Sequence, residues 1–170
     1  QDFVCGHGGA GKDQRGYDWF KSGPAPGNKG VSAPDLSANH TNSATLIRDA
    51  AVEFLTRMKS SPKPFFLYLP FQNIHSPYTC DPQYRALYAG KGFTEGEQTM
   101  FGYMSEMDAA VGEIMKAFKA SGKYENSYIF YSSDNGAPPA SGDVNHQIGS
   151  LPGWIARNYP LRGHKVRSCH

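Results

Sequence analysis

The sequence lacks any long hydrophobic run. Of its 170 residues, 39% are hydrophobic, 13% aromatic and 19% charged, and no apolar stretch approaches the roughly 20 residues that a membrane-spanning helix needs. This composition is typical of globular proteins, and a chain of this length buries about 70% of the surface that its unfolded form exposes. The sequence therefore predicts a folded domain, with no membrane span among these residues.

An excess of charge of one sign is also lacking. The chain has 17 basic and 15 acidic residues, which are interspersed and leave a net charge of +2. No basic cluster is long enough to follow a phosphate backbone. We therefore expect no nucleic-acid partner.

Cysteine is scarce and odd in number. Cys5, Cys80 and Cys169 cannot all pair within the chain, and their spacing matches no metal-binding cysteine pattern. One of them is expected to be free or to pair outside this chain.

The N-terminal residues lack the charged and apolar regions of a signal peptide, so we expect the start to be processed or internal. Asn39-His40-Thr41 is the only N-x-S/T sequon, and it lies in a polar segment where a glycan can attach. Chance is the alternative explanation. We predict a glycoprotein that carries its glycan on Asn39 and is secreted to the extracellular space or delivered to the lysosome.

The chain divides by composition into two regions. Residues 1–40 are rich in glycine and proline and have no apolar periodicity, which predicts a loop region with one short strand at residues 17–20. Residues 41–170 contain the periodic segments and form the predicted α/β domain.

Two helical patterns alternate with two apolar runs in this domain. An amphipathic helix is predicted over residues 41–58, followed by the buried strand "FFLYLP" at residues 65–70. A second helix, over residues 98–120, has a methionine-rich stripe that we interpret as core, and "YIFYSS" at residues 128–133 predicts another buried strand. This order predicts a mainly parallel sheet flanked by helices, whose ligand sites lie outside the carboxyl ends of the strands.

Polar side chains follow both predicted strands. Asp134 and Asn135 come directly after the second strand and offer only oxygen ligands, which suit a hard cation such as Ca²⁺ or Mg²⁺. Gly136 permits a sharp turn that lets both side chains face one point. The triplet alone is more typical of an Asx-turn that closes a strand.

His75 follows the first strand, and a cationic loop, "NYPLRGHK", lies near the C-terminal end with Arg162, His164 and Lys165. A single histidine in such a position is more often structural, and basic residues near a chain end are usually solvated. Combined with a hard cation, however, these groups suit a dianionic tetrahedral ester such as a sulfate or phosphate ester.

Three segments in this order resemble the type I sulfatases, specifically the arylsulfatase B-like branch of the alkaline phosphatase superfamily. They are "PFFLYLPFQNIHSPYTCDPQY", "MSEMDAAVGEIMKAFKASGKYENSYIFYSSDNGA" and "NYPLRGHK". The resemblance implies an alkaline phosphatase-like sulfatase domain, of which residues 41–170 are part. It also implies a calcium-dependent sulfuric ester hydrolase that acts on a sulfated small molecule or glycan.

The resemblance implies a role for each matching residue. Asp134 and Asn135 match the Ca²⁺ ligands of the family, with Mg²⁺ the less favoured metal. His75 and Lys165 match residues that contact the sulfate group, and Arg162 shapes the loop.

The sequence departs from the family in its nucleophile. The family attacks with a formylglycine made from the cysteine of a C-x-P-S-R motif, beside an Asp-Asp pair, and neither motif is present. "CDPQYR" at Cys80 has Pro82 but lacks the following serine and arginine, so we interpret it as a decoy.

We therefore expect an internal segment of a sulfatase catalytic domain that is inactive alone and needs the remainder of the domain or another chain. A non-catalytic secreted sulfatase-like structural or binding protein is the alternative. A phosphatase or phosphodiesterase of the same superfamily is less favoured, because those enzymes usually surround their metals with several Asp and His residues.

Overall fold

The structure is a computed structural model that describes residues 3–6, 19–22, 33–34, 36–38, 40–75 and 78–137. Along the chain the elements are β1 (Phe3–Gly6), β2 (Trp19–Ser22), β3 (Ala33–Pro34), the 3-10 turn η1 (Leu36–Ala38), α1 (Ser43–Met58), α2 (Pro82–Ala86), α3 (Glu95–Ala120) and the 3-10 turn η2 (Tyr124–Asn126).

Both predicted long helices are confirmed. The second begins three residues earlier than predicted, because Thr94 and Glu97 form a capping box: Thr94 Oγ1 accepts from the Glu97 amide at 3.3 Å, and the Thr94 amide donates to Glu97 Oε2 at 2.8 Å. Beyond its end, Gly122 has a φ of +73°, which glycine adopts without strain.

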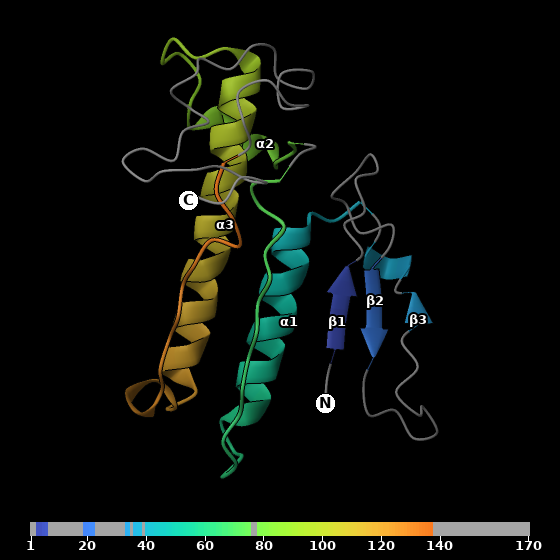
Figure 1. Cartoon of the computed structure of the whole chain (residues 1–170), viewed down its shortest axis with the longest axis vertical. Helices are drawn as coiled ribbons and strands as arrows, with labels where there is room; N and C mark the ends of the chain where they lie inside the picture. The colour runs from blue at the N-terminus through green and yellow to red at the C-terminus, as the bar shows by residue number, and fades with distance from the viewer. Residues whose placement is uncertain are drawn as a thin grey trace, which may run out of the picture.

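α1 and α3 lie side by side and run in the same direction (Figure 1). Their shared core contains Ala51 and Leu55 from α1 with Ile114 and Phe118 from α3. The predicted methionine stripe is only partly core, since Met104 is 42% exposed. The buried face of α3 instead contains Met100, Tyr103, Glu106, Ala110, Ile114 and Phe118.

Residues 65–71 return along the helix pair as an extended segment with alternating burial. Every second side chain packs against the helix core: Phe65, Leu67, Leu69 and Phe71. The side chains between them face away, and Phe66 is 89% exposed. This alternation is the period of a β-strand with one covered face.

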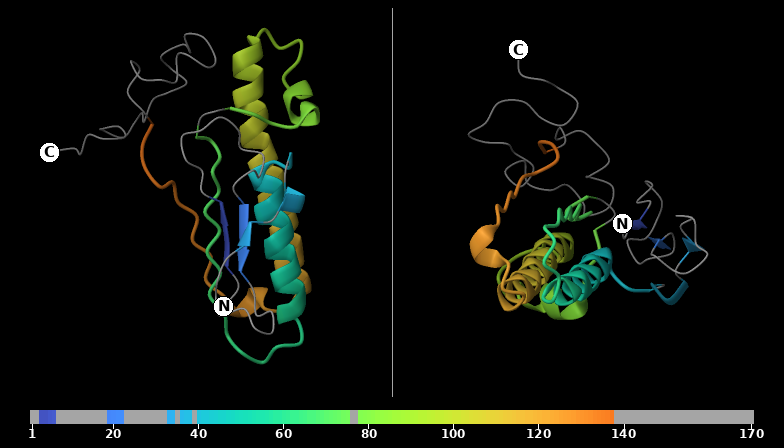
Figure 2. Two further views of the ribbon diagram at one scale, coloured as in Figure 1. Left: turned by 90° about the vertical axis from the view of Figure 1, so that its right-hand side faces the viewer. Right: turned by 90° about the horizontal axis from the view of Figure 1, so that it is seen from below.

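Residues 128–133 form a second extended segment, but their side chains are exposed, so the structure does not show the predicted buried strand. Tyr128 is 93% exposed and Phe130 is 91% exposed. Both extended segments lie on the same face of the helix pair and run in the same direction (Figures 1 and 2). Within the described part of the chain, neither is paired to another strand, so the parallel sheet stays a prediction.

The described residues of the N-terminal region include three short strands where the sequence predicted one. β1, β2 and β3 form an antiparallel sheet in that order, with Phe3 opposite Ser22 and Phe20 opposite Pro34. The strands are short and pair across long connections, so no local periodicity signals them. Trp19 anchors the sheet: it is 5% exposed and packs with Ala38 and with Ile47 of α1.

Truncation of the core between α1 and α3 tests this packing. Leu55 is 1% exposed, so we expect Leu55→Ala to lower the free energy of unfolding by about 2–5 kcal/mol through lost burial and a cavity. Leu87→Ala is the matched control, because Leu87 is 54% exposed and should change stability by less than about 0.5 kcal/mol. Urea unfolding measures both, and equal effects would contradict the assigned core.

Candidate functional site

His75 lies just beyond the first extended segment, in a turn. Its backbone amide donates to the carbonyl of Gln72 at 2.8 Å, and its side chain is exposed. The peptide bond between Asn73 and Ile74 in this turn is cis. Phe71, which precedes this turn, packs against the helix core, and this contact sets where the turn begins.

Asp134 and Asn135 lie just beyond the second extended segment, also exposed and in a turn. Asp134 Oδ1 accepts from the Asn135 amide at 2.8 Å, and Asn135 Nδ2 donates to the Gly136 carbonyl at 3.0 Å. Ser133 Oγ closes the turn with a bond of 2.7 Å to the Asn135 carbonyl. The Asp134 carboxylate bonds to the next residue and not to the one after it, so these bonds do not form an Asx-turn. The paired oxygen ligands stay a prediction.

The two extended segments end at the same end of the helix pair, near the start of α1 (Figures 1 and 2). His75 and the Asp134-Asn135 turn follow those ends directly. The remaining predicted site residues, Lys165, Arg162 and the glycan acceptor Asn39, lie outside the described residues.

The donor set at the Asp134-Asn135 turn fits a hard cation in kind. Asp134 Oδ2 and Asn135 Oδ1 accept no hydrogen bond from the described residues, and such oxygens are the ligands that Ca²⁺ prefers. A calcium ion takes six to eight oxygens. No three His, Cys, Asp or Glu side chains of the described chain gather as a metal site, so the predicted calcium site stays a prediction.

Comparison with known proteins identifies the family. The family model described as Sulfatase matches residues 4–168, almost the whole chain. The chain belongs to the sulfatase family.

Individual members match more narrowly. The chain is 31% identical to the sulfatase YdeN of Escherichia coli K12 over 134 residues, which cover 72% of this chain and 23% of the relative. It is 36% identical to mouse arylsulfatase J over 103 residues, 61% of this chain and 15% of that protein. The chain thus spans less than a quarter of these relatives.

Among solved structures, the crystal structure of Ps i-CgsB in complex with k-i-k-neocarrahexaose superposes with a TM-score of 0.61 at 24% identity. The match covers 81% of this chain and 26% of that one. It shows that the chain shares the fold of a part of that protein.

Cys80, in the "CDPQYR" segment of this sulfatase chain, is a free thiol packed against α3. Gly102 of α3 makes the approach possible, because a Cβ at that position would lie 2.7 Å from Cys80 Sγ and 2.8 Å from the Arg85 amide. Burial, together with the nearby Glu106 and Asp81 carboxylates, raises the pKa of the Cys80 thiol to about 11. Cys80 therefore stays neutral near pH 7, and its interpretation as a decoy stays a prediction.

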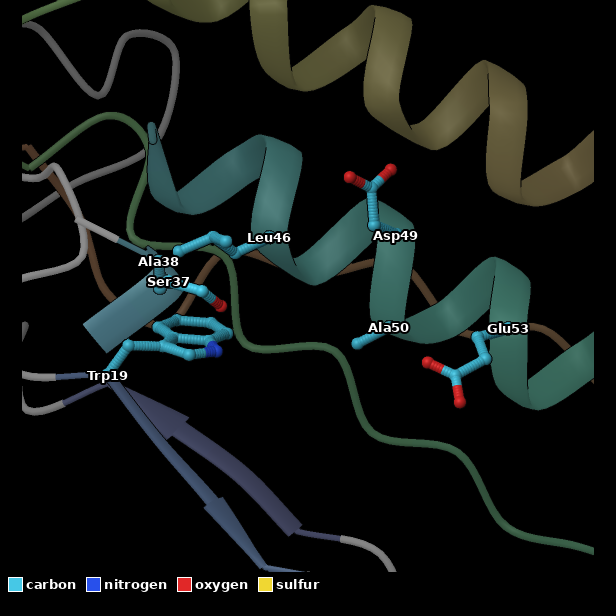
Figure 3. A pocket seen from close by; sticks show the side chains of 7 residues that line it. All are labelled: Trp19, Ser37, Ala38, Leu46, Asp49, Ala50 and Glu53. Carbon is cyan, nitrogen blue, oxygen red and sulfur yellow. The ribbon is translucent and has the colours of Figure 1, made fainter. Parts of the chain in front are cut away.

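A shallow groove between α1 and the N-terminal sheet does not belong to the site. It encloses about 200 Å³ and is lined by Trp19, Ser37, Ala38, Leu46, Asp49, Ala50 and Glu53 (Figure 3). Its two carboxylates point apart (Figure 3). Each also lies near an arginine of α1, with Asp49 at 2.8 Å from Arg48 and Glu53 at 4.0 Å from Arg57.

A buried polar network that the sequence analysis missed lies beside the His75 turn. Asn42 Nδ2 donates to Asp81 Oδ1 at 2.8 Å and to Glu106 Oε1 at 2.9 Å, and the Asp81 amide donates to the same Glu106 oxygen at 3.3 Å. Glu106 is 2% exposed and Asn42 is 5% exposed. The signal that could have revealed it is the charge of Glu106 on the apolar face of its helix.

The raised pKa predicts how Cys80 reacts with iodoacetamide. Because only the thiolate reacts, a thiol with a pKa of about 11 is about 1% ionised at pH 9, where an ordinary thiol is about three-quarters ionised. We expect Cys80 alkylation in the folded chain to rise with pH toward a midpoint near 11. Mass spectrometry of the Cys80 peptide measures the rate, with the urea-unfolded chain as control, and a folded-state midpoint near 9 would contradict the prediction.

Proposed function

We propose that this chain forms part of the active site of a calcium-dependent sulfuric ester hydrolase. The observation that carries the proposal is the arrangement of the two extended segments. They run in the same direction on one face of the α1 and α3 pair and end at the same end of it, and His75 and the Asp134-Asn135 turn follow directly. Membership of the sulfatase family supports the reaction class.

In this proposal each site residue has a role that follows from its charge. His75 contacts the sulfate group and protonates the leaving oxygen. Lys165 binds the sulfate oxygens that do not leave, and Asp134 and Asn135 hold the cation. When bound, Ca²⁺ withdraws charge from the sulfate oxygens. Because the C-x-P-S-R motif is absent from the sequence, the formylglycine nucleophile comes from outside these residues.

We further propose that residues 65–71 and 128–133 are parallel strands in the central sheet of a larger domain. The exposed faces of Phe66 and Phe130 support this proposal, since unpaired strands with large exposed aromatic side chains are unstable alone. The small share of each relative that the chain covers also supports it. The rest of the domain, or another chain, supplies the neighbouring strands.

The substrate class that we propose is a sulfated small molecule or a sulfated glycan. A solved neighbour of the same fold was crystallised with an oligosaccharide, k-i-k-neocarrahexaose, which favours a glycan. We place the protein outside the cell or in the lysosome, with a glycan on Asn39, because the sequon fits such a location. The arylsulfatase B-like branch also stays a proposal.

Hydrolysis of a chromogenic aryl sulfate tests the reaction class. The assay uses native protein that includes both this chain and the part of the domain that carries the formylglycine. In that protein we expect His75→Ala and Lys165→Ala each to lower kcat/KM by about 100-fold or more, because each removes a group that acts on the transition state. Lys63→Ala is the matched control, since Lys63 is exposed and outside the site. We expect the isolated 170 residues to be inactive, and turnover by them that depends on His75 or Lys165 would contradict the assignment of the nucleophile.

Calcium binding is tested by thermal unfolding. A ligand that binds only the folded state at 100 times its Kd stabilises it by about 2.7 kcal/mol, so we expect millimolar Ca²⁺ to raise the Tm. Asp134→Asn should abolish this increase, whereas Asp108→Asn, at an exposed position on α3, should retain it. If Ca²⁺ leaves the Tm unchanged in all three proteins and no sulfate ester is hydrolysed, the proposed function is wrong.

A further inference from the structure

The segment that carries His75 is fastened to α3 on both sides of the histidine. Before it, Asn73 Nδ2 donates to the carbonyl of Tyr103 at 2.8 Å. After it, the Asp81 amide donates to Glu106 Oε1 at 3.3 Å. Tyr103 and Glu106 are three residues apart on a helix, so both attachment points lie on one turn and one face of α3.

The second attachment point depends on a single carboxylate. Oxygen Oε1 of Glu106 accepts from the Asp81 amide and from Asn42 Nδ2, and Asn42 Nδ2 also donates to the Asp81 carboxylate. Asn42 precedes α1 and Asp81 precedes α2. One buried side chain thus joins the starts of two helices to the middle of the third.

The hydrogen bonds among Asn42, Asp81 and Glu106 leave other sources of stability unused. Asn42 occupies the N-cap of α1, yet its side chain makes no capping bond there, although such a bond is worth about 1 kcal/mol. A buried carboxylate is also costly unless it is hydrogen-bonded, and apolar replacements of buried ionic groups are often more stable. Helix packing alone therefore does not explain why a carboxylate is buried at position 106. A need to fix the position of Asp81 does explain it.

We propose that Glu106 is a positioning residue for His75, holding the end of its segment at Asp81 against α3. This inference rests on the proposed function for the role of the histidine, but its structural part does not. With the segment attached at Asn73 and at Asp81, the backbone at residue 75 has little freedom to move along the helix. The imidazole is thereby kept where a bound sulfate ester would meet it, and small displacements of a catalytic group can cost about 100-fold in rate.

Two substitutions separate position from charge. Glu106→Asp keeps the charge but withdraws the carboxylate by one methylene, so it cannot reach Asn42 and the Asp81 amide together. Glu106→Gln keeps the length and one acceptor oxygen. Glu113→Asp is the matched control, because Glu113 lies farther along α3 with its side chain 52% exposed and paired to Lys116.

Amide hydrogen exchange and kinetics are the two measurements. We expect Glu106→Asp to speed exchange about tenfold in peptides covering residues 72–75 and 78–81, as loss of one buried hydrogen bond predicts, while residues 110–120 of α3 exchange as in the parent. In active native protein its kcat should fall about 10- to 100-fold with KM changed less than about threefold. Glu106→Gln should keep the exchange rates and kcat within about threefold of the parent values. Glu113→Asp should match the parent in both measurements.

Three results would overturn the inference. Exchange of the His75 segment could be unchanged in Glu106→Asp. Exchange could rise equally along all of α3, which indicates a structural role only. In active protein, kcat could stay at the parent value. If the parent hydrolyses no sulfate ester, the proposed function fails, and the exchange measurement still decides whether Glu106 positions the segment.

Discussion

The packing of residues 65–71 across α1 and α3 is the contact on which the rest of the structure depends. Phe65 meets Phe54 and Phe118 edge-on, with ring centroids 5.3 and 6.2 Å apart. Leu69 and Phe71 touch both hydrophobic clusters, the one between the helices and the one around Trp19. This single segment therefore joins the helix pair to the N-terminal sheet, and its end fixes where the His75 turn begins.

Only one of the two extended segments that lead to the candidate site has a covered face. Residues 65–71 bury alternate side chains on the helices, whereas residues 128–133 leave Tyr128, Phe130 and Tyr131 largely in solvent. A strand fills its hydrogen bonds only with a neighbour. The His75 turn and the Asp134-Asn135 turn thus lie at the ends of segments whose remaining partners are, in our proposal, other strands of a sulfatase domain.

Polar groups in the interior make a different kind of contact. The hydrogen bonds among Asn42, Asp81 and Glu106 are directional, so they fix one relative position of α1, α2 and α3. Close approach at Gly102 acts with them, because it lets Cys80 and the start of α2 lie directly on α3. Shape and hydrogen bonding together hold Asn73, Cys80 and Asp81 against α3.

The sequence by itself determined the two long helices, the extended character of residues 65–71, and the order of motifs that identifies the sulfatase family. These features depend on periodicity and on residue types close together along the chain. Only the tertiary structure decided which face of α3 is buried, how the strands of the N-terminal sheet pair, and that Asn42 bonds to Asp81 and Glu106 rather than capping its own helix. Each of these depends on partners at least 12 residues apart along the chain or on a shift of one position around a helix. Such choices are made by the packing of whole elements, and no local pattern encodes them.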